Sequence, residues 1–364
     1  MLIHSLRRGG AERVCLELAA GLIRRGDVVE VAAWVDVDEY PDPDYQCIKR
    51  HYLMRHSDYR WVWSIPRSST RLCSMVNVFR PDLIVIHTPN VAWLTAWARL
   101  RIPCVHVLHG YGDITYSGSI KASIYKLLAR RAHKKLDAQL VTVSTSMRPV
   151  AAQYFGISES IVDCIVNGIN LSAFTPVESQ PSLPPRILMI GTLCANKGQL
   201  LGIEAFRLLL GVYEDATLLI VGDGIDFPRI HDSVKDHKLL GKVKLLGCRS
   251  DVSVLLSSSH VLWHLSKSEA MPMVVLEAMA TGIPVVGFDV RGTHDAVING
   301  ETGHLVPYGD IDSITQFTIS LLSNKQEWDT FSCQANCHVQ INYGLNMTIK
   351  KYQHVFLRKI NSGL

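Results

Sequence analysis

The sequence has no apolar run long enough to cross a membrane. None of its apolar stretches approaches the roughly 20 residues that a spanning helix needs. It also lacks the layout of a secretory signal peptide, because the first apolar residues give way at once to LRRGGAER at positions 6–13. We therefore expect a cytosolic protein.

The nine cysteines form no disulfide framework. Most lie in apolar runs, as Cys15, Cys104 and Cys164 do, and such cysteines are typical small core residues. Cys333 and Cys337 are one helical turn apart, but no second pair of ligands follows them. We therefore predict no metal site.

Length and charge indicate two domains and an anionic partner. A chain of 364 residues suits two domains of ordinary size, and 48% hydrophobic with 19% charged residues is the balance of a globular protein. Residues 51–150 hold 14 Lys or Arg against four Asp or Glu, although the whole chain has a net charge of only +4. A basic first half fits a phospholipid surface or a phosphate-bearing substrate. We expect no nucleic acid, because the basic residues belong to no recognised nucleic-acid module.

Short apolar runs alternate with longer amphipathic stretches. The apolar runs lie at residues 83–86, 104–108, 139–143, 186–190, 216–221, 242–246 and 283–286. Between them, stretches such as 11–25 space their apolar residues as a helix does. Strands that are apolar on both faces and separated by helices predict parallel sheets covered on both sides. The first strand is short, because only residues 1–4 precede the polar loop.

The segment from 166 to 185 contains four of the 15 prolines and has no periodicity. We therefore expect a first Rossmann-like domain at 1–166, a linker at 167–185 and a second Rossmann-like domain at 186–346. A helix at 347–362 is expected to pack back on the first domain. The two doubly wound domains should face each other across a cleft at the carboxyl ends of their sheets, where such folds bind ligands.

The strongest local signal is SKSEAMPMVVLEAMATG at residues 266–282. Pro272 suits the first turn of a helix, where a missing N–H costs nothing. The run 273–280 continues as a good helix former, and Gly282 suits a left-handed cap.

This segment predicts a seat for phosphate. The open N–H groups of Met273 and Val274, at the positive end of the helix dipole, favour an anion. Glu269 falls just before the helix and Glu277 about a turn and a half inside it. Two carboxylates beside a diphosphate seat can hold sugar and ribose hydroxyls at the two ends of a nucleotide sugar.

The segment resembles the E-x7-E signature of family 4 glycosyltransferases, which are retaining enzymes of the GT-B fold. The further landmarks of that family follow in order at Gly9-Gly10-Ala11-Glu12-Arg13, Pro81-Asp82 to His87, His109-Gly110, Asn167-Gly168-Ile169-Asn170 with Phe174, Lys197-Gly198, Gly222-Asp223-Gly224, and Leu246-Gly247 before Asp251. The match spans nearly the whole chain. It implies an α/β protein of the GT-B class, with two Rossmann-like doubly wound parallel-sheet domains.

The resemblance also implies roles for single residues. Lys197 would place a point charge on the departing diphosphate, in a fold that needs no metal there. Glu269 would orient the donor sugar and stabilise charge, while Glu277 would bind the ribose. His109 ends an apolar strand and would contact the sugar or the acceptor; a core histidine hydrogen-bonded to the backbone is the alternative.

The donor and nucleotide site implied in this way comprises Gly9, Gly10, Thr192, Lys197, Gly247, Cys248, Met273, Val274 and Glu277. Gly9 and Gly10 would let the backbone approach a diphosphate, since they carry no side chain and their φ is unrestricted. Gly247 and Cys248 would offer backbone groups to the base. We expect residues 222–224 to make little direct contact with a ligand.

The reaction implied is transfer of a sugar from a nucleotide sugar, with UDP-sugars expected first, to a hydroxyl of a glycan or lipid-linked acceptor. The leaving group would depart as a nucleoside diphosphate and the anomeric configuration would be retained, without a metal or other cofactor, as in the synthesis of bacterial surface polysaccharides. The basic amphipathic stretch 124–137 could lie on an anionic membrane, which predicts peripheral attachment to the inner face of the cytoplasmic membrane. A solvated helix is an equal alternative there.

Three positions depart from the family pattern. Thr192 stands where an arginine is common, so one of two cations on the diphosphate is missing. Ala270 replaces a frequent glycine, and Asp295 stands where a longer glutamate is usual. Thr192 and Asp295 keep a non-catalytic nucleotide-sugar-binding homologue open as an alternative. A nucleotide-sugar 2-epimerase is a second alternative, because it would bind the same donor on the same fold without an acceptor.

Overall fold

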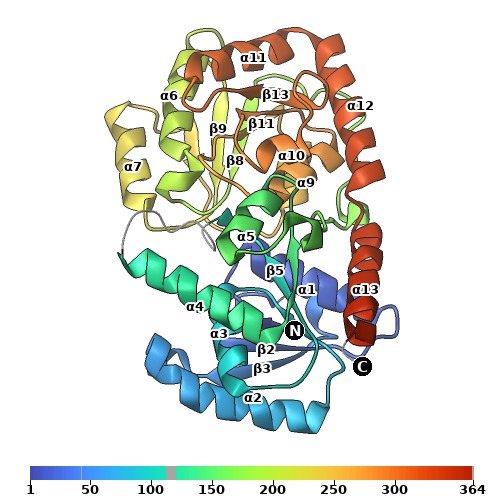
Figure 1. Ribbon diagram of the computed structural model, residues 1–364. Helices are drawn as coiled ribbons and strands as arrows, with labels where there is room; N and C mark the ends of the chain where they lie inside the picture. Colours follow the sequence, from blue (N-terminus) through green and yellow to red (C-terminus); the bar gives the residue numbers. More distant parts are fainter. Residues whose placement is uncertain (42, 112–119, 363–364) are drawn as a thin grey trace. The chain divides into compact units, whose positions relative to one another are not determined.

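The protein is described by a computed structural model at residues 1–41, 43–111 and 120–362 (Figure 1). The chain forms two compact units. The first comprises Met1–Gly168 together with helix α13 (Leu345–Ser362), and the second comprises Ile169–Gly344.

The first unit is built on a seven-stranded sheet in the order β3-β2-β1-β4-β5-β6-β7. Every neighbouring pair is parallel. The strands are β1 (Leu2–Ile3), β2 (Glu30–Val35), β3 (Lys49–Met54), β4 (Ile84–Ile86), β5 (Cys104–Leu108), β6 (Gln139–Thr142) and β7 (Asp163–Cys164).

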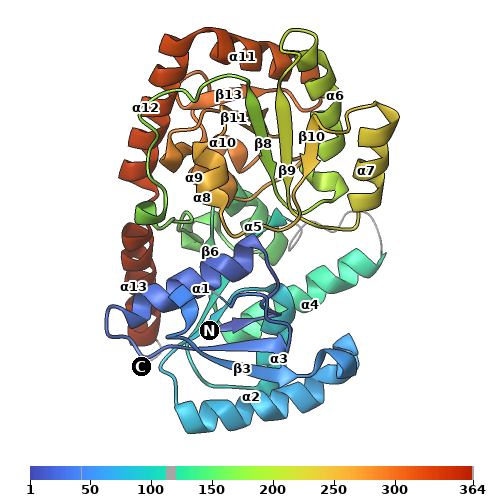
Figure 2. The same ribbon diagram turned by 180° about the vertical axis from the view of Figure 1, so that it is seen from behind.

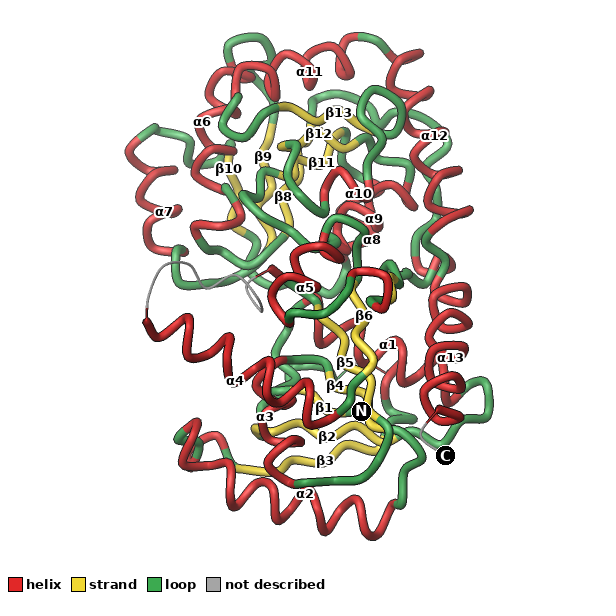
Figure 3. The backbone as a smooth tube through the Cα atoms, viewed as in Figure 1, coloured by secondary structure: helices red, strands yellow, loops and turns green. Residues whose placement is uncertain are grey.

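Except between β2 and β3, α-helices separate these strands along the chain, and they cover both faces of the sheet (Figure 3). They are α1 (Gly10–Ile23), α2 (Ile65–Phe79), α3 (Pro89–Ala98), α4 (Ile120–Leu136) and α5 (Met147–Phe155). Right-handed crossovers that lead in opposite directions from β1 place α1 on one face and α3 and α4 on the other. The stretch expected to be helical at 11–25 is α1, and its apolar residues Val14, Leu18 and Leu22 are buried.

Helix α13 completes the first unit from the far end of the chain, lying beside α1 (Figure 2). A Cβ at Gly21 of α1 would lie 2.1 Å from Cδ1 of Ile349, so the absence of a side chain there lets the two helices approach closely. Thr348 donates a hydrogen bond to the carbonyl of Val166 at 3.2 Å. Tyr352 and Phe356 are buried on the same helix.

The second unit is built on a six-stranded parallel sheet in the order β10-β9-β8-β11-β12-β13. Its strands are β8 (Arg186–Ile190), β9 (Thr217–Val221), β10 (Val243–Leu245), β11 (Val261–His264), β12 (Val285–Phe288) and β13 (Gly303–Val306). Its helices are α6 (Gln199–Leu210), α7 (Phe227–Asp236), α8 (Val252–Ser257), α9 (Met273–Thr281), α10 (Thr293–Ala296), α11 (Ile311–Ser323) and α12 (Lys325–Asn342).

Each sheet reverses its strand order once. From β8 the chain first moves to β9 and β10, and it then returns to add β11 on the other side of β8. The corresponding reversal in the first unit lies between β1 and β4. Loops diverge at such a point, which is where open parallel sheets bind their ligands.

The short first strand is a central strand, as the sequence predicts. The named strand has only two residues, but its pairing continues beyond them, since Val35 donates to the carbonyl of His4 at 3.0 Å. Leu6 likewise donates to the carbonyl of Val37 at 2.8 Å. Across the described ranges, no helix combines the length and the apolar character that crossing a bilayer requires.

Four histidines sit in or directly after buried strands and are held neutral. Burial lowers the pKa of His106 to about 3 and those of His109 and His264 to about 4. Burial also keeps the pKa of His87 well below its ordinary value. Both ring nitrogens of His106 lack a hydrogen-bond partner among the described residues.

These histidines should make folding stability depend on pH. Their folded pKa values lie below the unfolded value of about 6.5, so the unfolded chain binds more protons at acid pH. Stability should be complete above pH ~6.5 and fall toward pH ~4, by up to about 1.4 kcal/mol per pH unit for each histidine. Urea unfolding of the wild type and of His106→Phe across this range tests the expectation. The variant should lose less stability with acid, and equal slopes would contradict the account.

Candidate functional site

Lys197 and Glu269 meet at the strand-order reversal of the second unit. Lys197 ends a short 3-10 helix (Ala195–Lys197) in the loop after β8, and Glu269 lies in the loop after β11. The Lys197 ammonium donates to Oε1 of Glu269 at 2.5 Å. Two residues 72 positions apart are thus brought together because β8 and β11 are neighbours.

Two hydrogen bonds to backbone carbonyls hold these two loops together. The side-chain amide of Asn196 donates to the carbonyl of Ser268 at 2.9 Å, and the N–H of Lys267 donates to the carbonyl of Asn196 at 2.7 Å. Gly198 has a φ of +72°, and a Cβ there would lie 2.0 Å from the carbonyl oxygen of Leu265. A glycine is therefore required at this position by both conformation and space.

The Glu269 carboxylate is mostly buried and charged. Burial raises its pKa, but His264, Lys197 and a hydrogen bond from Ser266 together hold the pKa below its ordinary value. Glu269 therefore accepts hydrogen bonds at neutral pH and does not donate them.

Helix α9 (Met273–Thr281) begins shortly after Glu269 in the sequence. It begins at Met273, with Pro272 as the N-cap residue rather than the first helical residue that we expected. The amides of Met273 and Val274 have no partner within the helix, because first-turn N–H groups never do. Glu277 is only 3% exposed, and Gly282 closes the helix with a φ of +75°. The predicted helix and its left-handed cap are thus confirmed, and the phosphate seat at Met273 and Val274 stays a prediction.

The three departures from the family pattern have definite surroundings. Thr192 is exposed, and its carbonyl accepts a hydrogen bond from Gln199 at 3.0 Å. Ala270 is buried, and a Cβ at Gly292 would lie 2.5 Å from its carbonyl oxygen. Asp295 lies in α10, and its carbonyl accepts from the hydroxyl of Tyr343 at 2.8 Å.

Gly222 and Gly224 allow their loop to pack closely against a neighbouring loop. Cβ atoms at Gly222 and Gly224 would lie 2.0 Å and 2.3 Å from the carbonyl oxygens of Gly191 and Leu193. The loop after β9 therefore packs directly on the loop after β8. Gly247 follows β10 with a φ of +64°, and its carbonyl accepts from the N–H of Gly222 at 2.8 Å. Cys248 beside it is exposed.

In the first unit, the glycine loop is held by Tyr40. The hydroxyl of Tyr40 accepts from the N–H of Gly9 at 3.1 Å and donates to the carbonyl of Gly9 at 2.8 Å. Arg8 donates from its backbone N–H to the carboxylate of Glu39 at 3.0 Å. The loop before α1 is therefore fixed from the segment that follows β2.

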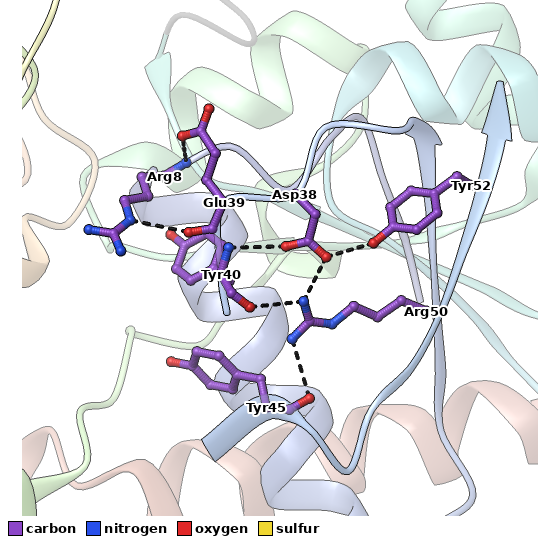
Figure 4. Close-up of polar contacts among 7 residues, drawn as sticks. All are labelled: Arg8, Asp38, Glu39, Tyr40, Tyr45, Arg50 and Tyr52. Carbon is purple, nitrogen blue, oxygen red and sulfur yellow. Dashed lines mark hydrogen bonds and ion pairs between the residues drawn. The ribbon is translucent and has the colours of Figure 1, made fainter. Parts of the chain in front are cut away.

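A polar network in turn supports this segment (Figure 4). Arg50 donates to the carboxylate of Asp38 at 2.6 Å and to the carbonyl of Tyr40 at 2.9 Å. The hydroxyl of Tyr52 donates to the same carboxylate at 2.6 Å. These bonds keep the backbone of Tyr40 in place, and so they support the hydrogen bonds between its hydroxyl and Gly9.

The two glycines of this loop do not adopt the backbone conformations that favour glycine. Gly9 is extended at a φ of −166°, and neither glycine is among the residues with positive φ. Their freedom of φ is therefore not used. Gly10 is exposed, and no described atom lies within 4 Å of a Cβ built on it, so its missing side chain leaves open space above the helix N-terminus.

His109 follows β5 and is paired with His87, which follows the neighbouring strand β4. Nε2 of His109 and Nδ1 of His87 share a hydrogen bond of 2.9 Å, and the two rings are stacked with centroids 5.1 Å apart. One ring must donate to the other, since both are neutral. Nδ1 of His109 and Nε2 of His87 are buried and have no partner in the described part of the chain.

The structure thus brings Lys197 and Glu269 into contact in the second unit, and Glu269 shortly precedes the N-terminus of α9 in the sequence. It places Gly9, Gly10 and His109 at the carboxyl edge of the first sheet. Sequence reasoning missed three supporting residues: Tyr40, Asn196 and His264. It named His87 as part of a family landmark but did not predict its pairing with His109. For His264 a signal existed, since a histidine ending the apolar strand VLWH is unusual for a buried position.

Comparison with known proteins agrees with this geometry. Residues 8–173 match the family described as glycosyltransferase family 4, and residues 175–336 match glycosyl transferases group 1. The chain is 28% identical over 298 residues to the UDP-Gal:alpha-D-GlcNAc-diphosphoundecaprenol alpha-1,3-galactosyltransferase of Escherichia coli, covering 77% of this chain and 76% of that one.

Two solved structures share the fold over nearly the whole chain. The complex of Anabaena HepE with UDP and glucose has a TM-score of 0.82 at 19% identity, covering 97% of both chains. The sucrose-phosphate synthase of Thermosynechococcus elongatus has a TM-score of 0.83 at 20% identity, covering 99% of this chain and 96% of that one. The chain belongs to the family 4, group 1 glycosyltransferases of the GT-B fold, and it is a glycosyltransferase.

The close approach at Gly198 can be measured by substitution. Gly198→Ala should destabilise the protein by roughly 2–5 kcal/mol, because a positive φ and a clash with the Leu265 carbonyl add together. Gly241→Ala is the matched control, since Gly241 has a φ of +89° and no described atom lies within 4 Å of its Cβ position. That variant should lose only about 1–2 kcal/mol. Equal losses in urea unfolding would show that the approach of the two loops is not tight.

Proposed function

We propose that this enzyme transfers a sugar from a UDP-sugar to a hydroxyl of a lipid-linked or glycan acceptor with retention of configuration. The pairing of Lys197 with Glu269 at the strand-order reversal carries the proposal. The E. coli relative is named for a UDP-galactose donor and a diphosphoundecaprenol-linked acceptor, which supports both halves of it. Synthesis of bacterial surface polysaccharide is the role that fits such an acceptor.

The diphosphate of the donor would sit at the N-terminus of α9. The amides of Met273 and Val274 and the positive end of the helix favour an anion there. Lys197 would add a full charge as the bond between the sugar C1 and the phosphate oxygen breaks. These protein groups are the reason that we expect no metal cofactor, although an arginine is missing at position 192.

The reacting groups would be arranged as follows. The electron pair of the broken C1–O bond leaves with the nucleoside diphosphate, and the acceptor oxygen bonds to C1 on the same face. The acceptor proton passes to the departing phosphate.

The residues would hold the parts of the donor in place. Glu269 would orient the sugar hydroxyls and Glu277 the ribose, and the backbone of Gly247 and Cys248 would hold the base. His109 would meet the sugar or the acceptor through Nδ1, and the open space at Gly10 would admit phosphate.

A nucleotide panel tests the donor half. UDP should raise the melting temperature more than GDP or ADP, since a ligand at 100 times its Kd adds about 2.7 kcal/mol of stability. Lys197→Met should weaken UDP binding roughly tenfold, the loss of one charge contact. Lys235→Met, at an exposed lysine of α7, is the control and should bind as the wild type does. Binding of no nucleotide would overturn the proposal.

The same protein distinguishes the alternatives by its products. A transferase should release UDP slowly from its donor alone and faster when the acceptor is present. A 2-epimerase would release no UDP in this way, and a non-catalytic binding protein would form no product.

We further propose that α4 rests on an anionic membrane surface. Ile124, Leu127 and Leu128 follow one another at helical spacing, and their side chains are 52%, 48% and 42% exposed. Arg131, Lys134 and Lys135 of the same helix are exposed as well. An exposed apolar stripe with cations beside it is typical of an interfacial helix.

Liposome flotation tests this attachment. The wild type should float with vesicles that contain anionic lipid and much less with neutral vesicles. Replacing Ile124, Leu127 and Leu128 by serine should abolish flotation, whereas Leu208→Ser, at a 45% exposed leucine of α6, should not change it. Equal flotation with anionic and neutral vesicles would contradict the proposed membrane attachment.

A further inference from the structure

His264 is the last residue of β11 and lies directly beside Glu269. Its side chain is 4% exposed, and Nε2 lies 3.6 Å from Oε1 of Glu269. This distance is beyond a hydrogen bond, which needs about 2.9 Å between nitrogen and oxygen. Nε2 has no hydrogen-bond partner among the residues that the structure describes. A buried polar atom of this kind costs free energy unless another state of the protein uses it.

The sheet holds this histidine firmly in place. His264 pairs in parallel register with Gly287 of β12. A Cβ at Gly287 would lie 2.6 Å from the carbonyl oxygen of His264 and 3.3 Å from its Cβ. The two strands therefore approach closely at this point, and the ring of His264 is carried by rigid backbone. Any adjustment that brings the two side chains together falls to Glu269, which lies in a loop.

The ammonium of Lys197 binds the same oxygen of Glu269 that His264 faces. It donates to Oε1 of Glu269 at 2.5 Å. In the proposed reaction this ammonium must serve the diphosphate at α9. When Lys197 turns to that anion, a carboxylate that is 13% exposed loses its nearest cation. The Ser266 hydroxyl would then be the one remaining donor named among the described residues for this mostly buried charge. A single neutral hydrogen bond compensates such a charge poorly, so a second donor is needed.

We propose that His264 is this second donor and acts as a positioning residue for Glu269. In the donor complex, the neutral ring donates its Nε2–H to Oε1 of Glu269 and holds the carboxylate against the sugar while Lys197 faces the diphosphate. The inference rests on the proposed function for the movement of Lys197. The hydrogen bond between His264 and Glu269 itself requires only that the ammonium of Lys197 leaves the Glu269 carboxylate.

Kinetics of two variants test the role. His264→Leu removes the donor at similar size and should lower kcat roughly 10- to 100-fold, as expected for one charge-assisted hydrogen bond. The Kd for UDP should stay within about twofold, since the ring faces a carboxylate. The acid limb of the kcat profile should move to higher pH, because Glu269 loses a bond that favours its charged form. His264→Gln restores an N–H donor and should recover most of the rate.

His304→Leu is the matched control. Nε2 of His304 lies 3.9 Å from Glu327 in the same unit, so this variant also removes a histidine near a carboxylate. It should leave kcat and the acid limb unchanged. Melting temperatures of all variants identify any loss of folded protein. An unchanged kcat and acid limb in His264→Leu, or a fall in kcat matched by weaker UDP binding, would overturn the proposal.

A spectroscopic measurement tests the pairing without turnover. In Lys197→Met, Glu269 lacks its ammonium even without donor, so His264 should bond to it in the free protein. Nitrogen-15 NMR of the histidine-labelled variant should show a new, exchange-protected Nε2–H signal that is absent in His264→Gln/Lys197→Met. No such signal refutes the inference. The signal together with an enzyme that binds no nucleotide would instead refute the proposed function alone.

Discussion

Two backbone loops, one after β8 and one after β11, lie closer together than side chains at their contact point would permit. Gly198 makes this approach possible, and the bonds between Asn196 and the 267–268 backbone hold it. The ammonium of Lys197 and the carboxylate of Glu269 meet as a consequence. The strands that carry these loops become neighbours only after the chain has built β9 and β10 on the other side. The site therefore depends on the order of strands in the sheet.

Burial decides which groups of the molecule carry charge. It lowers the pKa of His109 and His264 to about 4, so both rings act at neutral pH as hydrogen-bonding groups without charge. It does not neutralise Glu269, because Lys197 and Ser266 oppose its effect on that pKa. In the donor site that we propose, the charge of Lys197 acts together with the amides of α9, and Thr192 adds no second cation.

Much of the fold could be predicted from local pattern. Strand β5 at 104–108 and strand β8 at 186–190 stand where their apolar runs are, and Gly282 caps α9 as expected. The order of the family's motifs predicted the GT-B fold and the glycosyltransferase class correctly. The roles of single residues toward donor and acceptor stay predictions.

Contacts between distant segments could not be predicted in this way. The pairs His87–His109, Tyr40–Gly9 and His264–Glu269 depend on which strands are neighbours and on their register, which no local pattern contains. For the same reason, the sequence did not show that the first glycine loop leaves the freedom of φ of its glycines unused. Whether a glycine serves conformation or space is decided by what surrounds it, and at Gly10 the surroundings are open.

The return of α13 to the first unit has a consequence for the order in which the protein is made. Domains tend to fold as units while the chain is synthesised from its N-terminus. The second unit is one continuous stretch and can close when residue 344 has been added. The first unit is begun earlier but completed later, because the face of α1 that receives Ile349 stays uncovered until the last helix emerges. The half of the enzyme that is translated first is therefore the half that finishes folding last.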